Sequence, residues 1–131
     1  MARSKKFPTL SIVIPTLDEA NHLPLLLADL KAWPYSSDIK IVDGGSRDST
    51  ISIAQIQGIN IINSLEQNRG LQLGLGASNA KGEWLLFLHA DSRLDKVWVK
   101  KLLKIMQTKT SKNYAWYFDF KIKNITYNLE F

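Results

Sequence analysis

The chain has 131 residues, of which 45% are hydrophobic and 22% charged, so it holds enough apolar material for one compact domain and too little for two. It contains no cysteine, which excludes a disulfide framework, a thiolate metal site and a cysteine nucleophile. The net charge of +5 arises in residues 96–131, which hold eight lysines and two acids, whereas residues 1–95 hold nine bases and ten acids. We therefore expect a single domain over residues 1–131 with one basic end.

Strand and helix patterns alternate through the first 95 residues. Residues 10–14 predict a strand that stops at Pro15, and leucines at helical spacing predict a helix over residues 22–32 with Pro24 in its first turn. The same reasoning predicts strands over residues 39–42, 59–62 and 84–88, a helix that Asp48 or Ser49 caps and Gly58 ends, and a helix over residues 68–80. This alternation favours a mostly parallel sheet flanked by helices, which is an α/β fold.

The last third of the chain predicts a helix and then a strand. The helix covers residues 97–107, and its two sides differ in polarity: Trp98, Leu102, Ile105 and Met106 lie on one, and Lys100, Lys101 and Lys104 on the other. Aromatic and other residues alternate over residues 114–123, which is typical of an antiparallel or edge strand with one buried face. With this strand, the expected sheet has about five strands.

The basic end predicts two kinds of contact. Its lysine face is either an ordinary solvated helix face or a surface for an anionic membrane, and the weak interleaving of aromatic residues with lysines disfavours nucleic acid. The aromatic face within residues 112–131 predicts self-association, unless this segment folds back over the sheet of the same chain.

The chain shows no pattern for crossing or leaving a membrane. No apolar run approaches the roughly 18 residues of a spanning helix, and the residues that follow the first basic ones do not resemble a secretory signal. We expect a cytoplasmic protein, with peripheral contact at the inner membrane face as a further option.

Polar loops follow three of the predicted strands, at residues 16–19, 43–46 and 89–92. Ligands of parallel α/β sheets bind beyond the carboxyl ends of the strands, so these loops predict the site. Asp43 either presents its carboxylate to a ligand or forms a turn with Gly44. Asp91 either holds a divalent cation together with phosphate oxygens or caps a helix.

Other residues are weaker candidates or exclude a function. Arg69 either holds phosphate at the start of a helix or makes a surface salt bridge, and His89 is more often a structural residue than a ligand. The glycines of residues 74–79 imitate a dinucleotide fingerprint inside a predicted helix, which argues against a nicotinamide or flavin site. The chain has no P-loop, and Ser46 and Ser49 have no histidine nearby in sequence for a hydrolase triad.

Four blocks of sequence, taken together and in order, resemble family 2 glycosyltransferases with the GT-A fold. The blocks are Ser11-Ile12-Val13-Ile14-Pro15-Thr16-Leu17-Asp18-Glu19-Ala20, Ile41-Val42-Asp43-Gly44-Gly45-Ser46-Arg47-Asp48-Ser49-Thr50, Asn68-Arg69-Gly70 and Gly82-Glu83-Trp84-Leu85-Leu86-Phe87-Leu88-His89-Ala90-Asp91. The resemblance covers residues 10–93. It implies a Rossmann-like, nucleotide-diphospho-sugar transferase fold that ends before the acceptor-binding half.

The resemblance also implies a site for a nucleotide-diphosphate sugar. In it, Pro15, Thr16 and Glu19 lie beside the nucleotide, Asp43 on the base, Arg69 near the base or the phosphates, and Asp91 on the metal and the diphosphate. Leu17, Gly44, His89 and Ala90 complete the expected substrate-binding residues. The implied cofactor is a divalent cation, Mg²⁺ or Mn²⁺.

Two departures from the family pattern bear on catalysis. The metal motif Asp-any-Asp is His89-Ala90-Asp91 here, so one carboxylate ligand is left, and some branches of the family look like this. No residue matches the general base of the family, and neither Asp119 nor Glu130 lies in such a motif. The expected function is transfer of a sugar from a nucleotide donor to an unknown acceptor by inverting displacement. The alternative is a catalytically incomplete nucleotide-sugar-binding module that self-associates or needs a partner.

Overall fold

The computed structural model describes residues 7–118 and contains strands and helices in strict alternation up to α4. The elements are β1 (Leu10–Thr16), α1 (Leu23–Leu30), β2 (Ser37–Asp43), α2 (Thr50–Ile56), β3 (Asn60–Asn63), α3 (Arg69–Asn79), β4 (Trp84–Phe87), α4 (Trp98–Gln107) and the 3₁₀ helix η1 (Ser111–Asn113). The predicted α/β fold is confirmed, and each predicted helix lies within two residues of its expected bounds.

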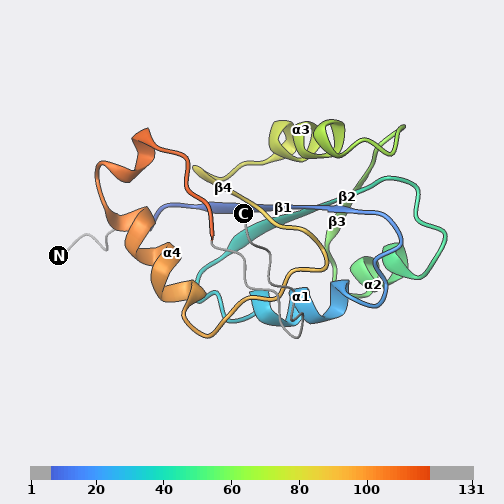
Figure 1. Ribbon diagram of the computed structural model, residues 1–131, viewed down its shortest axis with the longest axis horizontal. Coiled ribbons are helices and arrows are strands. Elements are labelled where there is room, and N and C mark those ends of the chain that lie inside the picture. The colour runs from blue at the N-terminus through green and yellow to red at the C-terminus, as the bar shows by residue number, and fades with distance from the viewer. Residues whose placement is uncertain (1–6, 119–131) are drawn as a thin grey trace, which may run out of the picture.

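The four described strands form one parallel sheet in the order β3-β2-β1-β4. Figure 1 shows α3 alone on one face of this sheet and α1, α2 and α4 on the other. Since every strand runs in the same direction, the carboxyl ends of β1, β2 and β4 meet at one edge, as the sequence predicted.

Pro15 does not end the first strand, contrary to the sequence-based expectation, because β1 continues to Thr16. The N–H of Leu88 donates to the C=O of Val13 at 3.1 Å, so odd-numbered residues of β1 turn their backbone groups toward β4. The pairing between β1 and β4 ends at Val13. The position where Pro15 lacks an N–H therefore lies beyond the paired part of β4, and the strand tolerates the proline there.

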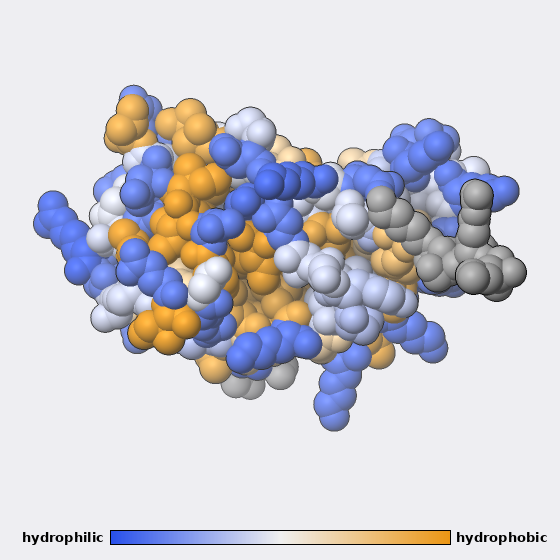
Figure 2. Space-filling model, turned by 180° about the vertical axis from the view of Figure 1, so that it is seen from behind, coloured by the Kyte–Doolittle hydropathy of each residue, from blue (hydrophilic) through white to orange (hydrophobic). Residues whose placement is uncertain are grey.

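The main core lies between the sheet and the layer of α1, α2 and α4. It contains residues such as Ile12, Ile14, Leu26, Trp98 and Leu102, all less than a tenth exposed. Figure 2 views the molecule from behind and shows hydrophobic residues gathered over one half and the middle of the visible surface, with hydrophilic residues scattered over and around them.

The opposite face of the sheet packs closely against α3. A Cβ added to Gly76 of α3 would lie 2.2 Å from Val13 Cγ1 of β1. Only a glycine allows the helix this near approach. The glycine-rich stretch that imitates a dinucleotide fingerprint thus lies inside a helix, as expected, and serves helix–sheet packing.

An aromatic cluster packs α4 against the rest of the fold. The ring of Trp33 stacks on Trp98 of α4 with centroids 5.8 Å apart, and Phe7 stacks on Tyr35 at 4.3 Å. The buried side of α4, formed by Trp98, Leu102 and Met106, is the one that the sequence predicted.

The expected strand over residues 114–123 is not present in its described part, because residues 114–118 form no strand. Tyr114, Trp116 and Tyr117 are exposed instead of alternating between two faces. The rest of that stretch, and most of the segment expected to self-associate, lies outside the described residues. Self-association through residues 112–131 therefore stays a prediction.

Candidate functional site

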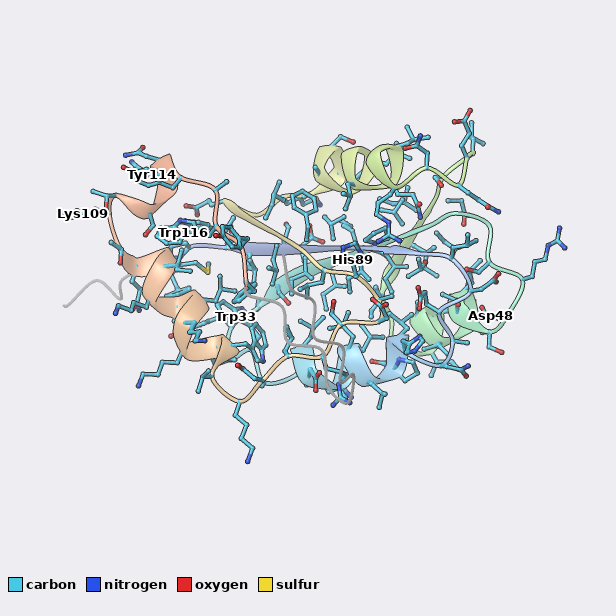
Figure 3. All side chains as sticks on the ribbon, in the orientation of Figure 1. Trp33, Asp48, His89, Lys109, Tyr114 and Trp116 are labelled. Atoms are coloured by element: carbon cyan, nitrogen blue, oxygen red, sulfur yellow. The ribbon has the colours of Figure 1, made fainter. Side chains whose placement is uncertain are left out.

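The loops that follow β1, β2 and β4 hold the predicted site residues, at the carboxyl edge of the sheet. Figure 3 shows Asp48 toward one end of the molecule and His89 nearer its middle, while Lys109, Tyr114 and Trp116 lie at the opposite end. The predicted residues differ in access. Those buried are Pro15, Thr16, Asp43, Gly44 and Ala90; Glu19 is half-buried; and Leu17, Arg69, His89 and Asp91 are exposed.

The Asp43 carboxylate is fully buried and accepts four hydrogen bonds. Thr16 Oγ1 and Ser46 Oγ donate to Oδ1 at 2.7 and 2.6 Å, and the N–H groups of Gly45 and Ser46 donate to Oδ2 at 3.0 and 2.8 Å. Burial raises the pKa of Asp43, but the hydrogen bonds from Ser46, Thr16 and Gly45 outweigh it, and the net pKa lies below the usual value. Both oxygens are thus committed to holding the loop after β2 against the end of β1.

Gly44 and Gly45 allow this loop to close around the carboxylate. Gly45 adopts a φ of +103°, in the region that favours glycine. Asp43 therefore acts as the turn former that the sequence allowed as one of its two roles. Its contact with a nucleobase stays a prediction.

A second aspartate, Asp18, connects the same two loops from the β1 side. It has a φ of +52°, its N–H donates to Ser46 Oγ at 2.9 Å, and its Oδ1 accepts from the N–H of Arg47 at 2.8 Å. Such positive-φ residues are uncommon and persist where surrounding contacts hold them. The loop after β1 is thereby fixed to the loop after β2.

Asp48 and Thr50 complete this connection at the start of α2. The N–H of Ala20 donates to Asp48 Oδ2 at 3.0 Å, and the N–H of Glu19 donates to Thr50 Oγ1 at 2.9 Å. Ser49, one of the two residues that the sequence predicted as the cap, occupies the N-cap position of α2 without a side-chain cap hydrogen bond, while Asp48 Oδ1 accepts from the N–H of Thr50 at 2.9 Å. The hydrogen bonds from Thr50 hold the pKa of Asp48 below its usual value.

Gln72 fixes α3 to the edge of the sheet. Its side chain is 5% exposed, and its Nε2 donates to the backbone carbonyls of Thr16 at 3.1 Å and Val42 at 2.9 Å. The amide thus satisfies two carbonyls at the ends of β1 and β2. The start of α3, with Arg69, is held over these strand ends.

Arg69 and His89 contact each other across the edge, from the start of α3 and the end of β4. A guanidinium nitrogen of Arg69 donates to Nδ1 of His89. Both residues are exposed, and Asp91 is exposed two positions further on. The sequence named these three residues separately, and the structure brings the first two into contact. The surface salt bridge considered for Arg69 is not found among the described residues.

The loop that carries Asp91 is attached to α1. Arg93 donates from Nε and from an Nη to the two oxygens of Asp29, at 2.8 and 3.2 Å, and the N–H of Leu94 donates to Asp29 Oδ2 at 3.0 Å. These contacts, chiefly the hydrogen bond from Arg93, hold the pKa of Asp29 below its usual value. The position of Asp91 is therefore set by residues outside its own strand.

The described residues contain no cluster that could hold a metal ion by itself. Within residues 7–118, no three histidine or acidic side chains gather as a potential ligand group. Asp91 offers one carboxylate, and Mg²⁺ is ordinarily bound by one or two carboxylates together with substrate phosphates and water. Asp91 thus fits a cation that a diphosphate helps to hold.

Glu19 lies near the start of α1 and contacts His22, whose Nδ1 is 3.1 Å from Glu19 Oε2. His22 occupies the N-cap position of α1 and makes no side-chain cap hydrogen bond.

Sequence reasoning missed several residues that shape this edge: Asp18, Ser46, Asp48 as a loop connector, Thr50 and Gln72. Asp18, Ser46 and Asp48 lie in the loops already singled out, so their position was visible but their partners, about thirty residues away in sequence, were not. Gln72 gives only a weak signal in the sequence. It is a polar residue in a predicted helix, and only the structure shows that it is buried.

The sequence model described as "Glycosyl transferase family 2" matches residues 11–129, most of the chain. The chain belongs to this family. The resemblance seen in the four sequence blocks is therefore confirmed, although the His-Ala-Asp variant of the metal motif is not itself tested by this match.

Known proteins of similar sequence and fold agree with this membership. The "PGL/p-HBAD biosynthesis glycosyltransferase" of Mycobacterium tuberculosis is 38% identical to this family 2 chain over 94 residues, which cover 66% of the chain and 37% of that protein. The structure of TarS 1-349 of S. aureus in complex with UDP-GlcNAc matches this chain with a TM-score of 0.63 at 24% identity. The match covers 74% of this chain and 30% of the TarS chain. The structure of the mannosyltransferase PcManGT of Pyrobaculum calidifontis, in complex with GDP-Man and Mn²⁺, matches this chain with a TM-score of 0.68 at 19% identity. That match covers 77% of this chain and 32% of the PcManGT chain.

These likenesses confirm the GT-A type of fold for the described residues. The family 2 chain spans little more than a third of the curated relative and about a third of each solved structure. None of the helices in residues 7–118 is both long enough and apolar enough to cross a bilayer.

Proposed function

We propose that this chain binds the nucleotide and diphosphate of a nucleotide-diphosphate sugar at the carboxyl edge of its sheet, as the donor-binding part of a glycosyltransferase. The observation that carries the proposal is the contact between the exposed side chains of Arg69 and His89 at that edge, with Asp91 exposed two positions after His89. At the same edge, hydrogen bonds between the loops after β1 and β2 hold these loops in fixed positions.

Arg69 is suited to hold phosphate. It is the first residue of α3, which Asn68 caps by accepting from the N–H of Leu71 at 3.0 Å. The N-terminus of a helix carries partial positive charge, and a guanidinium adds donors that match phosphate oxygens. In the proposed complex, Arg69 donates hydrogen bonds to the phosphate in place of some that it now donates to His89.

Asp91 is the residue that holds a divalent cation in this proposal. The cation, when bound with the donor, supplies positive charge that stabilises the departing diphosphate. Because the described residues offer one carboxylate at this position, we expect the diphosphate to contribute most of the other ligands. The contact between Arg93 and Asp29 keeps the loop of Asp91 in place.

The proposed reaction is a direct displacement at the anomeric carbon. The acceptor hydroxyl oxygen forms the new bond, the diphosphate leaves with the electron pair, and the configuration inverts. A general base must remove the hydroxyl proton. No residue of the chain is assigned this role, and the sugar, the nucleobase and the acceptor are left open.

Calorimetric titration of the full chain with UDP and with GDP, in Mn²⁺ and in a metal chelator, tests the proposal. We expect one of the two nucleotides to bind in Mn²⁺, and the substitution Asp91→Asn to weaken its affinity by about tenfold or more, which equals at least about 1.4 kcal/mol. Glu83→Gln, which removes an exposed acid at the start of β4, is the matched control and leaves the affinity unchanged. Absence of binding heat for both nucleotides under both conditions contradicts the proposal.

A further inference from the structure

The segment from Lys96 to Phe118 is basic throughout. It contains no aspartate or glutamate, no arginine, and six lysines, which are Lys96, Lys100, Lys101, Lys104, Lys109 and Lys112. All six are exposed, and none takes part in the ion pairs found within residues 7–118. This part of the surface therefore carries positive charge with no acid of its own to neutralise it.

The lysines of α4 flank a shallow apolar groove. Lys100 and Lys104 follow one another at an interval of four residues, which places them on one face of α4, and Lys96 lies two residues before the start of the helix. Val99 and Leu103 line the groove beside these lysines, and both are partly buried and pack in part against the main core. The fully buried side of α4 is formed by Trp98, Leu102 and Met106, so the lysines are turned outward.

Exposed aromatic rings follow α4 along the chain. Tyr114, Trp116 and Tyr117 are 67%, 54% and 89% exposed. Trp116 is held in place, because its Nε1 donates to the C=O of Ser111 at 3.1 Å and its ring meets that of Tyr114 edge to face. Figure 3 shows Lys109, Tyr114 and Trp116 together at one end of the molecule.

We propose that α4 and residues 109–117 form a docking surface for an anionic lipid bilayer. Lysines are attracted to the negative potential of such a surface, and short apolar side chains between them enter the boundary between headgroups and acyl chains. Tyrosine and tryptophan rings are favoured at this boundary, since they combine an apolar body with a polar tip.

The residue types favour lipid over nucleic acid. Nucleic-acid surfaces commonly rely on arginine for two-point contact with phosphates and bases, and this segment has none. The exposed parts of Val99 and Leu103 gain apolar contacts at a bilayer but none on a phosphate backbone. This inference goes beyond the proposed function, because the docking surface and the carboxyl edge of the sheet lie at opposite ends of the molecule (Figure 1).

Co-sedimentation of the full chain with vesicles tests the docking surface. The vesicles contain phosphatidylcholine alone, or phosphatidylcholine with about one third phosphatidylglycerol, in low and in high salt. The variant is Lys100→Gln with Lys104→Gln. The matched control is Lys31→Gln with Lys81→Gln, which removes two exposed charges from other parts of the surface.

We expect binding to the anionic vesicles only, and its loss in high salt. Each lysine near the surface contributes up to about fivefold in partitioning, so the α4 double variant falls by about tenfold or more, while the control keeps most of the binding. Trp116 is the one tryptophan in the described residues that is more than half exposed, so its emission shifts to shorter wavelength on binding and the shift disappears in Trp116→Phe.

Three results overturn the proposal. The first is equal binding to neutral and anionic vesicles. The second is an equal loss in the α4 variant and the control variant, which indicates a response to net charge alone. The third is tighter binding to a DNA duplex than to the anionic vesicles under the same salt, which assigns the surface to nucleic acid.

Discussion

Asp43 stabilises the carboxyl edge of the sheet from inside the protein. Its carboxylate is fully buried and accepts from Thr16, from Ser46 and from two backbone N–H groups. A buried charge is stable only when such donors surround it. The loops after β1 and β2 therefore depend on a residue that does not itself reach solvent.

Substitution Asp43→Asn should lower the free energy of unfolding by about 2–4 kcal/mol. The side-chain amide has no charge, and its NH₂ group would face two of the groups that now donate to the carboxylate. Urea unfolding followed by circular dichroism measures the change. Glu66→Gln, an exposed acid on a loop, is the control and should change the free energy of unfolding by less than about 0.5 kcal/mol. Equal stability of Asp43→Asn and the wild type contradicts the structural role.

The lowered pKa of Asp43 predicts a dependence of stability on pH. Because the pKa in the folded state lies below the unfolded value, the stabilisation is present above about pH 4 and is lost as the pH falls through the folded-state pKa. The difference in unfolding free energy between the wild type and Asp43→Asn should therefore shrink below about pH 4. A difference that stays constant from neutral to acidic pH shows that the charge of Asp43 does not contribute.

The sequence located the candidate site but not the partners within it. An aspartate followed by two glycines after an apolar strand indicates both a turn and a ligand contact, and only the fold shows that Thr16 and Ser46 reach its oxygens. The contact between Arg69 and His89 joins residues 20 positions apart on different elements. Local patterns identify residue types, whereas these contacts depend on how α3 is placed over the sheet.

At the scale of elements, α3 determines where the proposed phosphate-binding residue lies. The helix approaches β1 closely at Gly76, and Gln72 bonds the carbonyls at the ends of β1 and β2. These two contacts set the height and the direction of the helix. A shift of α3 away from the sheet moves Arg69 relative to His89.

Two glycines of α3 provide a matched pair for testing this packing. In Gly76→Ala, the added Cβ meets the side chain of Val13, and we expect a loss of about 1–3 kcal/mol in the free energy of unfolding. In Gly74→Ala, the added Cβ meets nothing within 4 Å, and we expect a gain of up to about 1 kcal/mol from helix propensity. Thermal unfolding of both variants measures the contrast, and equal effects of the two substitutions refute the close approach.

The order and type of the elements followed from sequence periodicity, and their ends often did not. Pro15 predicted the end of a strand. The strand continues because β4 pairs with β1 only as far as Val13, so no hydrogen bond to β4 is lost where Pro15 lacks an N–H. Alternating aromatic residues predicted a strand after α4, yet its described part, residues 114–118, forms none. The end of β1 depends on how far β4 pairs with it, which a local pattern does not contain.

At the scale of the whole molecule, the chain has a proposed donor-binding end and a proposed membrane-docking end. The carboxyl edge of the sheet lies at one end, and α4 with the exposed aromatic residues lies at the other (Figures 1 and 3). The basic segment begins at Lys96, after the last of the loops that form the candidate site. The lysine-rich segment is therefore separate from the candidate site both in the sequence and in the fold.

This separation predicts that the two ends act independently. The double substitution Lys100→Gln with Lys104→Gln should weaken binding to anionic vesicles and leave the affinity for the nucleotide unchanged, since neither lysine lies near the carboxyl edge. Calorimetric titration of the variant with the nucleotide measures this. A parallel loss of both kinds of binding shows that the two ends are coupled or that the variant is unfolded, and circular dichroism separates these two causes.

The central claim is that a nucleoside diphosphate binds at the carboxyl edge of the sheet, beside Arg69 and His89. The most direct measurement is the change in backbone amide chemical shifts of the ¹⁵N-labelled chain when UDP or GDP is added with Mg²⁺. We predict that the largest changes cluster in residues 16–19, 44–46, 69–72 and 89–92. Changes that cluster on α4 or on β3 instead, or no changes with either nucleotide, contradict the claim.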